Sequence, residues 1–234
     1  MNKKYEAWPL GRLRKEWQRS ELEDVKSIGY EWDDPRDVVD AFEERVAKLT
    51  GSKYAVAVDC CSHGLFLAMK YLRCEGEITI PKRTWVSVPM QIKHAGCNPI
   101  FEDTEWSGAY QLKPYPIWDA AVRFTKDMYI PDTLMVLSFQ IKKILPIGRG
   151  GMILTDSKEA YDWLRKARID GRNTTATYDE DNVEIIGWHF YMTPEDAARG
   201  ILLMDEIPSV NEDTGGWENY SDLSEKRAFN ESFN

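Results

Sequence analysis

The sequence is poor in cysteine and has no long apolar run, and each absence excludes a class of protein. Its four cysteines among 234 residues (Cys60, Cys61, Cys74 and Cys97) show no metal-ligand spacing, and the two adjacent ones have poor geometry for a mutual disulfide. We therefore predict reduced thiols, no metal site and a cytoplasmic location. No stretch approaches the length of a membrane span, and the first residues contain no apolar signal segment.

An excess of positive charge is also absent. The net charge is −9, and acidic and basic residues are mixed along the chain. Nucleic-acid grooves and anionic-membrane surfaces need clustered Lys and Arg, so we expect neither nucleic acid nor membrane as a partner. The hydrophobic fraction of 43% and the charged fraction of 29% are typical of a soluble globular chain long enough for one sizeable domain.

What the sequence does contain is a regular alternation of predicted strands and helices. Short apolar runs predict strands at 54–58, 77–81, 99–103, 116–119, 134–138 and 151–155. Helical spacing and end signals predict helices at 34–51, 62–72, 87–96, 157–169 and 193–206. This order indicates an α/β domain with a largely parallel sheet over residues 34–207. Residues 1–33 are predicted to form an N-terminal arm, and residues 208–234 a polar tail that is extended or loosely held.

Three of these elements place chemically useful residues at strand ends, where parallel α/β sheets bind ligands. Ser62 opens a helix whose free N–H groups can hold a phosphate. Asp119 ends one buried strand, and Ser138 ends another just before Lys142 and Lys143. An aspartate, a lysine and a phosphate cradle are what pyridoxal 5'-phosphate (PLP) requires, because the lysine forms a Schiff base and the carboxylate keeps the pyridine nitrogen protonated. Taken separately, an aspartate at a strand end is more often a structural cap, a lysine pair in a loop is more often solvated, and a serine at a helix start is more often a plain N-cap.

The order of these pieces resembles a known family. From Gly29 to Ile207 the chain is similar to the DegT/StrS-type sugar aminotransferases, PLP enzymes of fold type I (aspartate-aminotransferase-like) that act on nucleotide-linked keto-sugars. The matching segments are VVDAFEERVAKLTGSKYAVAV, ITIPKRTWVSVPMQIKHAGCNPIFEDTE, WDAA, LSFQIKKILPIGRGGMILTD, RIDGR and IGWHFYMTPEDAARGILLMDEI. The resemblance implies a three-layer α/β/α PLP-binding large domain with a mostly parallel sheet. Compared with the family, we expect the C-terminal small domain to be largely missing. Only fifteen residues separate Asp103 from Asp119, where the resemblance implies an additional helix and strand.

The resemblance also implies roles for individual residues. Lys143, the fourth residue after Phe in the Ser-Phe block, would bind PLP covalently and act in catalysis, whereas Lys142 falls on a variable position. Asp119 would pair with the pyridine nitrogen, and Trp85 would stack on the ring.

Further positions concern the phosphate. Ser62 and Ser138 would hold it, and Cys61 precedes Ser62 where relatives have Gly-Thr. His189 stands in place of the asparagine that reaches a partner subunit's phosphate in relatives, which implies a homodimer with shared active sites. Val122 replaces the His or Gln that usually follows Asp-Ala-Ala.

These roles predict a PLP-dependent aminotransferase that transfers an amino group, with glutamate as the expected donor, to a nucleotide-linked keto-sugar. Two alternatives remain open. The chain could be a non-catalytic descendant that binds PLP or a sugar nucleotide, or a PLP-dependent sugar dehydratase or epimerase. A nicotinamide-binding Rossmann enzyme is a weaker alternative, because the GRGG turn precedes a strand and not a helix.

Overall fold

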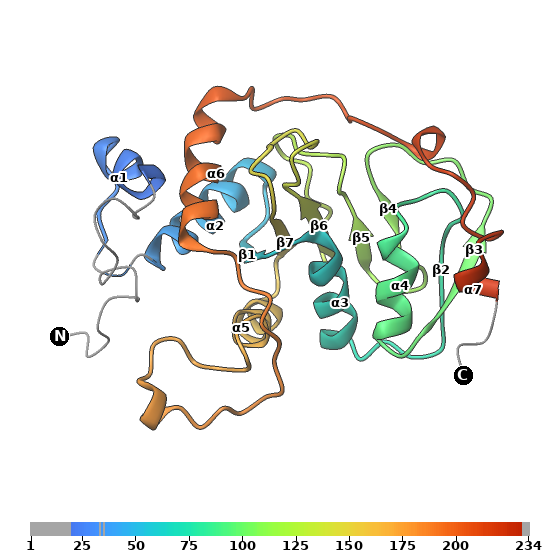
Figure 1. The fold of residues 1–234 in the computed structure, drawn as a ribbon, viewed down its shortest axis with the longest axis horizontal. Helices are drawn as coiled ribbons and strands as arrows, with labels where there is room; N and C mark the ends of the chain where they lie inside the picture. Colours follow the sequence, from blue (N-terminus) through green and yellow to red (C-terminus); the bar gives the residue numbers. More distant parts are fainter. Residues whose placement is uncertain (1–19, 33, 35, 231–234) are drawn as a thin grey trace.

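The computed structural model describes residues 20–32, 34 and 36–230, and it has an α/β architecture built on a five-stranded sheet (Figure 1). The order in this sheet is β1-β7-β6-β5-β4, and β2 and β3 form a separate two-stranded parallel sheet. The strands are β1 (Tyr54–Val58), β2 (Glu77–Pro81), β3 (Asn98–Glu102), β4 (Tyr110–Gln111), β5 (Ile117–Asp119), β6 (Leu134–Ser138) and β7 (Gly151–Thr155).

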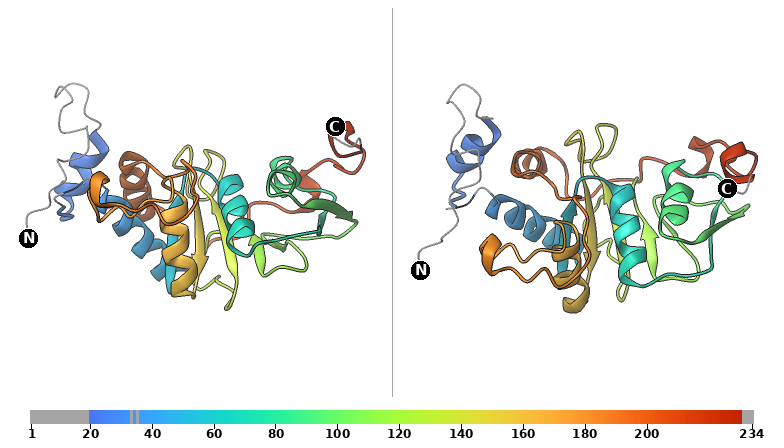
Figure 2. Two further views of the ribbon diagram at one scale, coloured as in Figure 1. Left: turned by 90° about the horizontal axis from the view of Figure 1, so that it is seen from below. Right: turned by 60° about the horizontal axis from the view of Figure 1, so that its bottom comes forward.

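Helices flank the strands in chain order. They are α1 (Ser20–Ser27), α2 (Asp37–Thr50), α3 (Cys61–Tyr71), α4 (Ser87–His94), α5 (Lys158–Ala167), α6 (Pro194–Glu206) and α7 (Arg227–Asn230), with short 3₁₀ turns η3 (Tyr178–Glu180) and η4 (Trp217–Asn219). In Figures 1 and 2, α1 and α7 lie at opposite ends of the molecule. Among the described residues, no helix combines the length and apolar character needed to cross a lipid bilayer.

The main sheet is mixed, whereas the sequence predicted a mostly parallel one. Only β5 and β6 pair in parallel, and β7 runs antiparallel to both of its neighbours. The connection between β6 and β7 contains no helix, whereas a parallel return needs a crossover that usually runs through one. The chain instead turns back through residues 139–150, where Gly148 and Gly150 adopt positive φ angles.

The three-layer arrangement expected from the resemblance is confirmed. Alternate side chains of the strands point to opposite faces of the sheet. Ala57, Leu137 and Met152 belong to a core shared with α2 and α6, whereas Val58 and Val136 belong to a second core shared with α3, α4 and α5. The sheet is therefore covered by helices on both faces.

The expected elements are present, with ends that differ from the prediction by a few residues. The short strand β4 and the helix α1 were not predicted. A two-residue strand is too short for a periodic pattern, and α1 shows only one buried residue, Val25.

The segment after α6 also differs from the prediction. Apart from η4 and α7 it is extended, as Figure 1 shows in orange and red, but it is held by specific contacts rather than loosely. Arg123 and Asp213 form a two-pronged ion pair with N–O distances of 2.8 and 2.7 Å. The backbone N–H of Thr214 donates to the carbonyl of Val122 at 2.9 Å, and that of Leu223 to Lys82 at 2.8 Å.

Candidate active site

Asp119 ends β5 with its side chain almost fully buried, at 4% exposure. Its Oδ1 accepts the backbone N–H of Ala121 at 2.9 Å, and its Oδ2 accepts the hydroxyl of Tyr110 at 2.7 Å. The Tyr110 hydroxyl also contacts the buried hydroxyl of Thr84. Burial raises the pKa of Asp119 above its usual value, although the hydrogen bond from Tyr110 opposes that shift. The carboxyl is therefore desolvated but held by two donors.

The two adjacent lysines have different surroundings. Lys142 is exposed, whereas Lys143 is half-buried. Lys143 lies in a turn in which its backbone N–H donates to the backbone carbonyl of Gln140 at 2.8 Å. The positive charge of Lys143 lowers the pKa values of Asp119 and Cys61, although burial raises both more strongly. Lys143 thus lies within electrostatic reach of the buried carboxyl.

The start of α3 lies beside the same carboxyl. The Ser62 hydroxyl lies 2.6 Å from that of Ser87, so the first turns of α3 and α4 meet there. Gly151 of β7 makes the close approach possible, since a Cβ at this position would lie 2.6 Å from backbone atoms of Cys60 and Cys61. The N–H groups at a helix start favour an anion. Hydroxyl and N–H donors from two helices thus converge near Asp119.

Cys61 lies beside Asp119, at the position for which the resemblance implies glycine. Its Sγ lies 3.9 Å from the Asp119 Oδ1 and 3.9 Å from the carbonyl oxygen of Val136. Burial and the neighbouring Asp119 raise the pKa of Cys61 well above its usual value, so the group is a neutral thiol at pH 7. A neutral thiol carries no charge beside the carboxyl, and its S–H donates a long hydrogen bond that favours the carboxylate form of Asp119.

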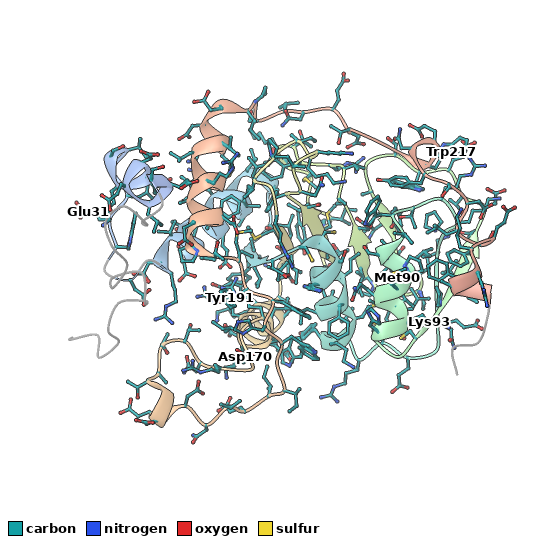
Figure 3. All side chains as sticks on the ribbon, viewed as in Figure 1. Glu31, Met90, Lys93, Asp170, Tyr191 and Trp217 are labelled. Atoms are coloured by element: carbon teal, nitrogen blue, oxygen red, sulfur yellow. The ribbon has the colours of Figure 1, made fainter. Side chains whose placement is uncertain are left out.

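The remaining predicted site residues are less closely joined. Trp85 follows β2 and is 60% exposed, so its ring is accessible to a ligand. Ser138 ends β6 and is half-buried. His189 is exposed, and its Nδ1 lies 2.8 Å from an oxygen of Asp170, in the region where Figure 3 labels Asp170 and Tyr191. The contacts of His189 therefore run to another part of the chain than the Asp119 cluster.

Three residues of this cluster were not predicted from the sequence. Tyr110 and Thr84 position Asp119, and Tyr220 of the C-terminal segment lies close to it: burial and the nearby Asp119 and Cys61 raise the pKa of Tyr220. Thr84 lies in a matching segment, directly before Trp85, but it was given no role there. Tyr110 and Tyr220 lie outside the matching motifs, and the short strand and the returning segment that bring them to Asp119 were not predicted.

A second polar cluster lies at the other side of the α3 start. Asp59 pairs with the Nδ1 of His63 and with Arg149, each at 2.7 Å, and His63 stacks on Phe190 at 3.7 Å between ring centroids. Burial lowers the pKa of His63, but hydrogen bonds to Asp59 and Cys60 outweigh it and raise the pKa to about 9. Asp59, Cys60 and His63 have donor atoms within 4.8 Å of one another, a possible metal-ligand set. Because the carboxylate already serves two cations, the cluster is satisfied without a metal ion.

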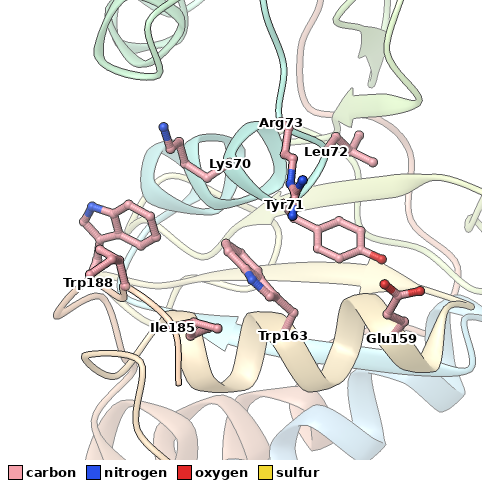
Figure 4. Close-up of a pocket in the computed structure, with 9 residues that line it drawn as sticks. Lys70, Tyr71, Leu72, Arg73, Glu159, Trp163, Ile185 and Trp188 are labelled. Atoms are coloured by element: carbon pink, nitrogen blue, oxygen red, sulfur yellow. The ribbon is translucent and has the colours of Figure 1, made fainter. Parts of the chain in front are cut away.

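A cavity of about 650 Å³ lies elsewhere, between α3 and α5 (Figure 4). Aromatic side chains (Tyr71, Trp163 and Trp188) and the cations of Lys70 and Arg73 line it. None of the predicted site residues lines this cavity, so it is separate from the Asp119 cluster.

Comparison with known proteins agrees with the resemblance to the sugar aminotransferase family. The sequence profile described as the DegT/DnrJ/EryC1/StrS aminotransferase family matches residues 17–128 and 131–222. Spore coat polysaccharide biosynthesis protein SpsC of Bacillus subtilis is 24% identical, with 76% of this chain and 60% of SpsC covered. The chain therefore spans about 60% of the length of this curated relative.

Solved structures show the same fold. Sugar aminotransferase CalS13 from Micromonospora echinospora superposes with a TM-score of 0.63 at 19% identity, covering 80% of this chain and 64% of CalS13. Helicobacter pylori PseC, an aminotransferase involved in the biosynthesis of pseudoaminic acid, gives a TM-score of 0.62 at 14% identity, covering 80% of this chain and 62% of PseC.

Proposed function

Because this chain belongs to the DegT/DnrJ/EryC1/StrS family of PLP-dependent aminotransferases, we propose that it is itself a sugar aminotransferase that holds PLP between Asp119 and Lys143. The observation that carries the proposal is the buried carboxyl at the end of β5, within reach of a lysine charge and beside two helix starts. A structural cap needs only one carboxylate oxygen, and Ala121 uses Oδ1 in that way. The second oxygen, held by Tyr110, has a lone pair left for a pyridinium N–H.

The residues present fit the cofactor. Asp119 would accept the ring nitrogen, Lys143 would hold the cofactor covalently, and the exposed ring of Trp85 would stack on it. The hydroxyl groups of Ser62 and Ser138, with the N–H groups at the start of α3, would hold the phosphate. Cys61 supports the fit less well, since its thiol stands beside the same carboxyl.

In this proposal each residue has a stated task. PLP, when bound, supplies an electron-withdrawing ring that stabilises negative charge on the carbon carrying the amino group. Once the amino group of the donor has replaced Lys143 on the cofactor, the freed Lys143 amine would take the proton from the α-carbon of the donor, which requires a neutral amine at that moment. Asp119 keeps the ring nitrogen protonated, and its burial excludes water from that contact.

The donor and acceptor are proposed from the resemblance: glutamate gives the amino group, and a nucleotide-linked keto-sugar receives it. We also propose a cytoplasmic homodimer with shared sites. The exposure of His189 supports this, since a side chain 68% exposed is available to reach a second copy.

The test is titration of the purified protein with PLP, followed by borohydride reduction and mass spectrometry to locate the modified lysine. We expect modification of Lys143 in the wild type and in Lys142→Ala, and none at this segment in Lys143→Ala. Modification that disappears with Lys142→Ala instead would refute the assignment of the lysine. Formation of 2-oxoglutarate from glutamate with a panel of keto-sugar nucleotides then tests the reaction.

A non-catalytic PLP-binding protein is the second candidate, and Cys61 favours it. The thiol lies 3.9 Å from the Asp119 Oδ1, where relatives have glycine. Stable cofactor binding without amine transfer to any sugar nucleotide would support this candidate. Restored transfer in Cys61→Gly would identify the thiol as the cause.

A further inference from the structure

The C-terminal segment 211–224, here called the strap, docks on the part of the chain that is shortened relative to the family. Its backbone pairs with residues 106–108: Gly108 N–H donates to the Gly215 carbonyl and Trp217 N–H to the Trp106 carbonyl, each at 3.0 Å. Figure 1 shows the strap crossing from α6 to the far side of β4, and Figure 3 labels Trp217 on it.

Two glycines fit the strap to this surface. A Cβ at Gly108 would lie 2.0 Å from the Oδ2 of Asp213, and a Cβ at Gly216 would lie 2.6 Å from the carbonyl oxygen of Trp106. Both approaches are too close for any side chain. The ion pair between Asp213 and Arg123 fixes the strap further, with both side chains less than one-third exposed. The strap is therefore held at several points.

The strap brings Tyr220 to the Asp119 cluster through a column of aromatic rings. Tyr220 stacks on Trp106 with ring centroids 5.7 Å apart and an interplanar angle of 23°. Trp106 contacts Tyr110 at 4.7 Å, and Tyr110 donates its hydroxyl to Asp119 at 2.7 Å. The indole N–H of Trp106 donates to the Arg83 carbonyl at 2.8 Å, which fixes the middle ring of the column.

We propose that Tyr220, which the strap brings to this column, is a positioning residue for Asp119. Its ring presses Trp106 against Tyr110, so that the Tyr110 hydroxyl stays on the carboxylate and water is kept away from it. This inference rests on the proposed function, since it assigns Tyr220 a role in PLP binding. The ring, and not the hydroxyl, carries this role, because the stacking contact is what joins Tyr220 to the column.

The test compares PLP dissociation constants, measured from tryptophan fluorescence quenching and visible absorbance, for the wild type, Tyr220→Ala and Tyr220→Phe. We expect Tyr220→Ala to weaken binding by about threefold to tenfold, the range that an aromatic pair contributes beyond its buried area. Tyr220→Phe keeps the ring and should bind within about twofold of the wild type. Circular dichroism and urea unfolding of the cofactor-free proteins check that each variant folds.

Trp217→Ala is the matched control, because it removes an aromatic ring from the same strap; that ring lies over Arg83, with its centroid 5.3 Å from the guanidinium carbon. Binding within about twofold of the wild type is expected. Equal weakening in both alanine variants would assign the effect to docking of the whole strap and overturn the role of Tyr220. Unchanged or tighter binding by Tyr220→Ala would also overturn it, the latter because the ring would then compete with the cofactor. A wild type that binds no PLP would instead refute the proposed function, and this inference with it.

Discussion

Replacing Tyr110 by phenylalanine removes one hydroxyl from a buried site and tests how Asp119 is held. The hydroxyl donates to the carboxylate at 2.7 Å, and both side chains are at most 5% exposed. A hydrogen bond to a charged group contributes about 1.5–3 kcal/mol, whereas one between neutral groups contributes about 1 kcal/mol. We therefore expect Tyr110→Phe to lower the free energy of unfolding by about 2 kcal/mol or more at pH 7 and by about 1 kcal/mol near pH 3, where the carboxyl is protonated.

The sign of this pH dependence follows from linkage. Burial raises the folded-state pKa of Asp119 above its unfolded value, so the group costs stability as pH rises from the unfolded pKa to the folded one. The hydrogen bond from Tyr110 lowers the pKa of Asp119 and thus reduces that cost. Removing this hydrogen bond raises the folded-state pKa of Asp119 further. The cost of ionising the buried carboxyl then increases, and the free energy of unfolding falls more steeply toward neutral pH.

The assay is urea unfolding of the cofactor-free protein at several pH values between 3 and 7, with the slope checked for constancy. Tyr115→Phe is the matched control, because its hydroxyl donates at 2.9 Å to the backbone carbonyl of Glu75 and touches no carboxylate. The change in the free energy of unfolding caused by Tyr115→Phe should not depend on pH between 3 and 7. A loss of stability for Tyr110→Phe that is equally independent of pH would refute the reasoning, since Asp119 would then not be ionised beside the hydroxyl.

Three further perturbations test other parts of the structure. Glu43→Gln should destabilise the protein by about 3–5 kcal/mol in urea unfolding, because it leaves the buried guanidinium of Arg168 without its carboxylate; a loss below about 1 kcal/mol would contradict this. Asp59→Asn should lower the pKa of His63 from about 9, which proton NMR can follow. It should also remove the stability that this ion pair contributes. That contribution is fully present below the unfolded pKa of about 6.5 and is lost as pH rises through about 9. Gly151→Ala should lower the free energy of unfolding by about 1–3 kcal/mol and weaken PLP binding, because its Cβ would lie 2.6 Å from the backbone at the start of α3. Unchanged PLP binding would show that this backbone does not contact the phosphate.

The strands and helices that were predictable are those with a strong local pattern. The run YAVAV became β1, and α6 begins with its N-cap at Thr193, whose hydroxyl accepts the N–H of Asp196. Such signals lie within a few residues of one another, so they can be identified in one sequence. The direction of β7 was not predictable from periodicity, because an apolar run looks the same in parallel and antiparallel pairing.

Residues of the candidate site were predicted only where a motif carried them. Asp119 and Lys143 stand in recognisable segments, and the structure brings their charges within reach of each other. Tyr110 and Tyr220 are separated from those motifs and come to the site through β4 and the strap. Contacts between segments so far apart in sequence depend on the fold as a whole, and a single sequence carries no local signal for them.

The cost of burying Asp119 is itself an argument about its purpose. A desolvated carboxylate destabilises a fold unless hydrogen bonds and charges compensate it. A structural cap at the end of β5 could be made by a partly exposed side chain, and Ala121 needs only one oxygen. This chain instead places the buried Tyr110 hydroxyl, which also contacts the buried Thr84 hydroxyl, on the other oxygen, and keeps a lysine charge near the carboxyl. Such an arrangement is better explained by a ligand that uses the second oxygen than by the needs of the fold, which favours the cofactor site over the cap.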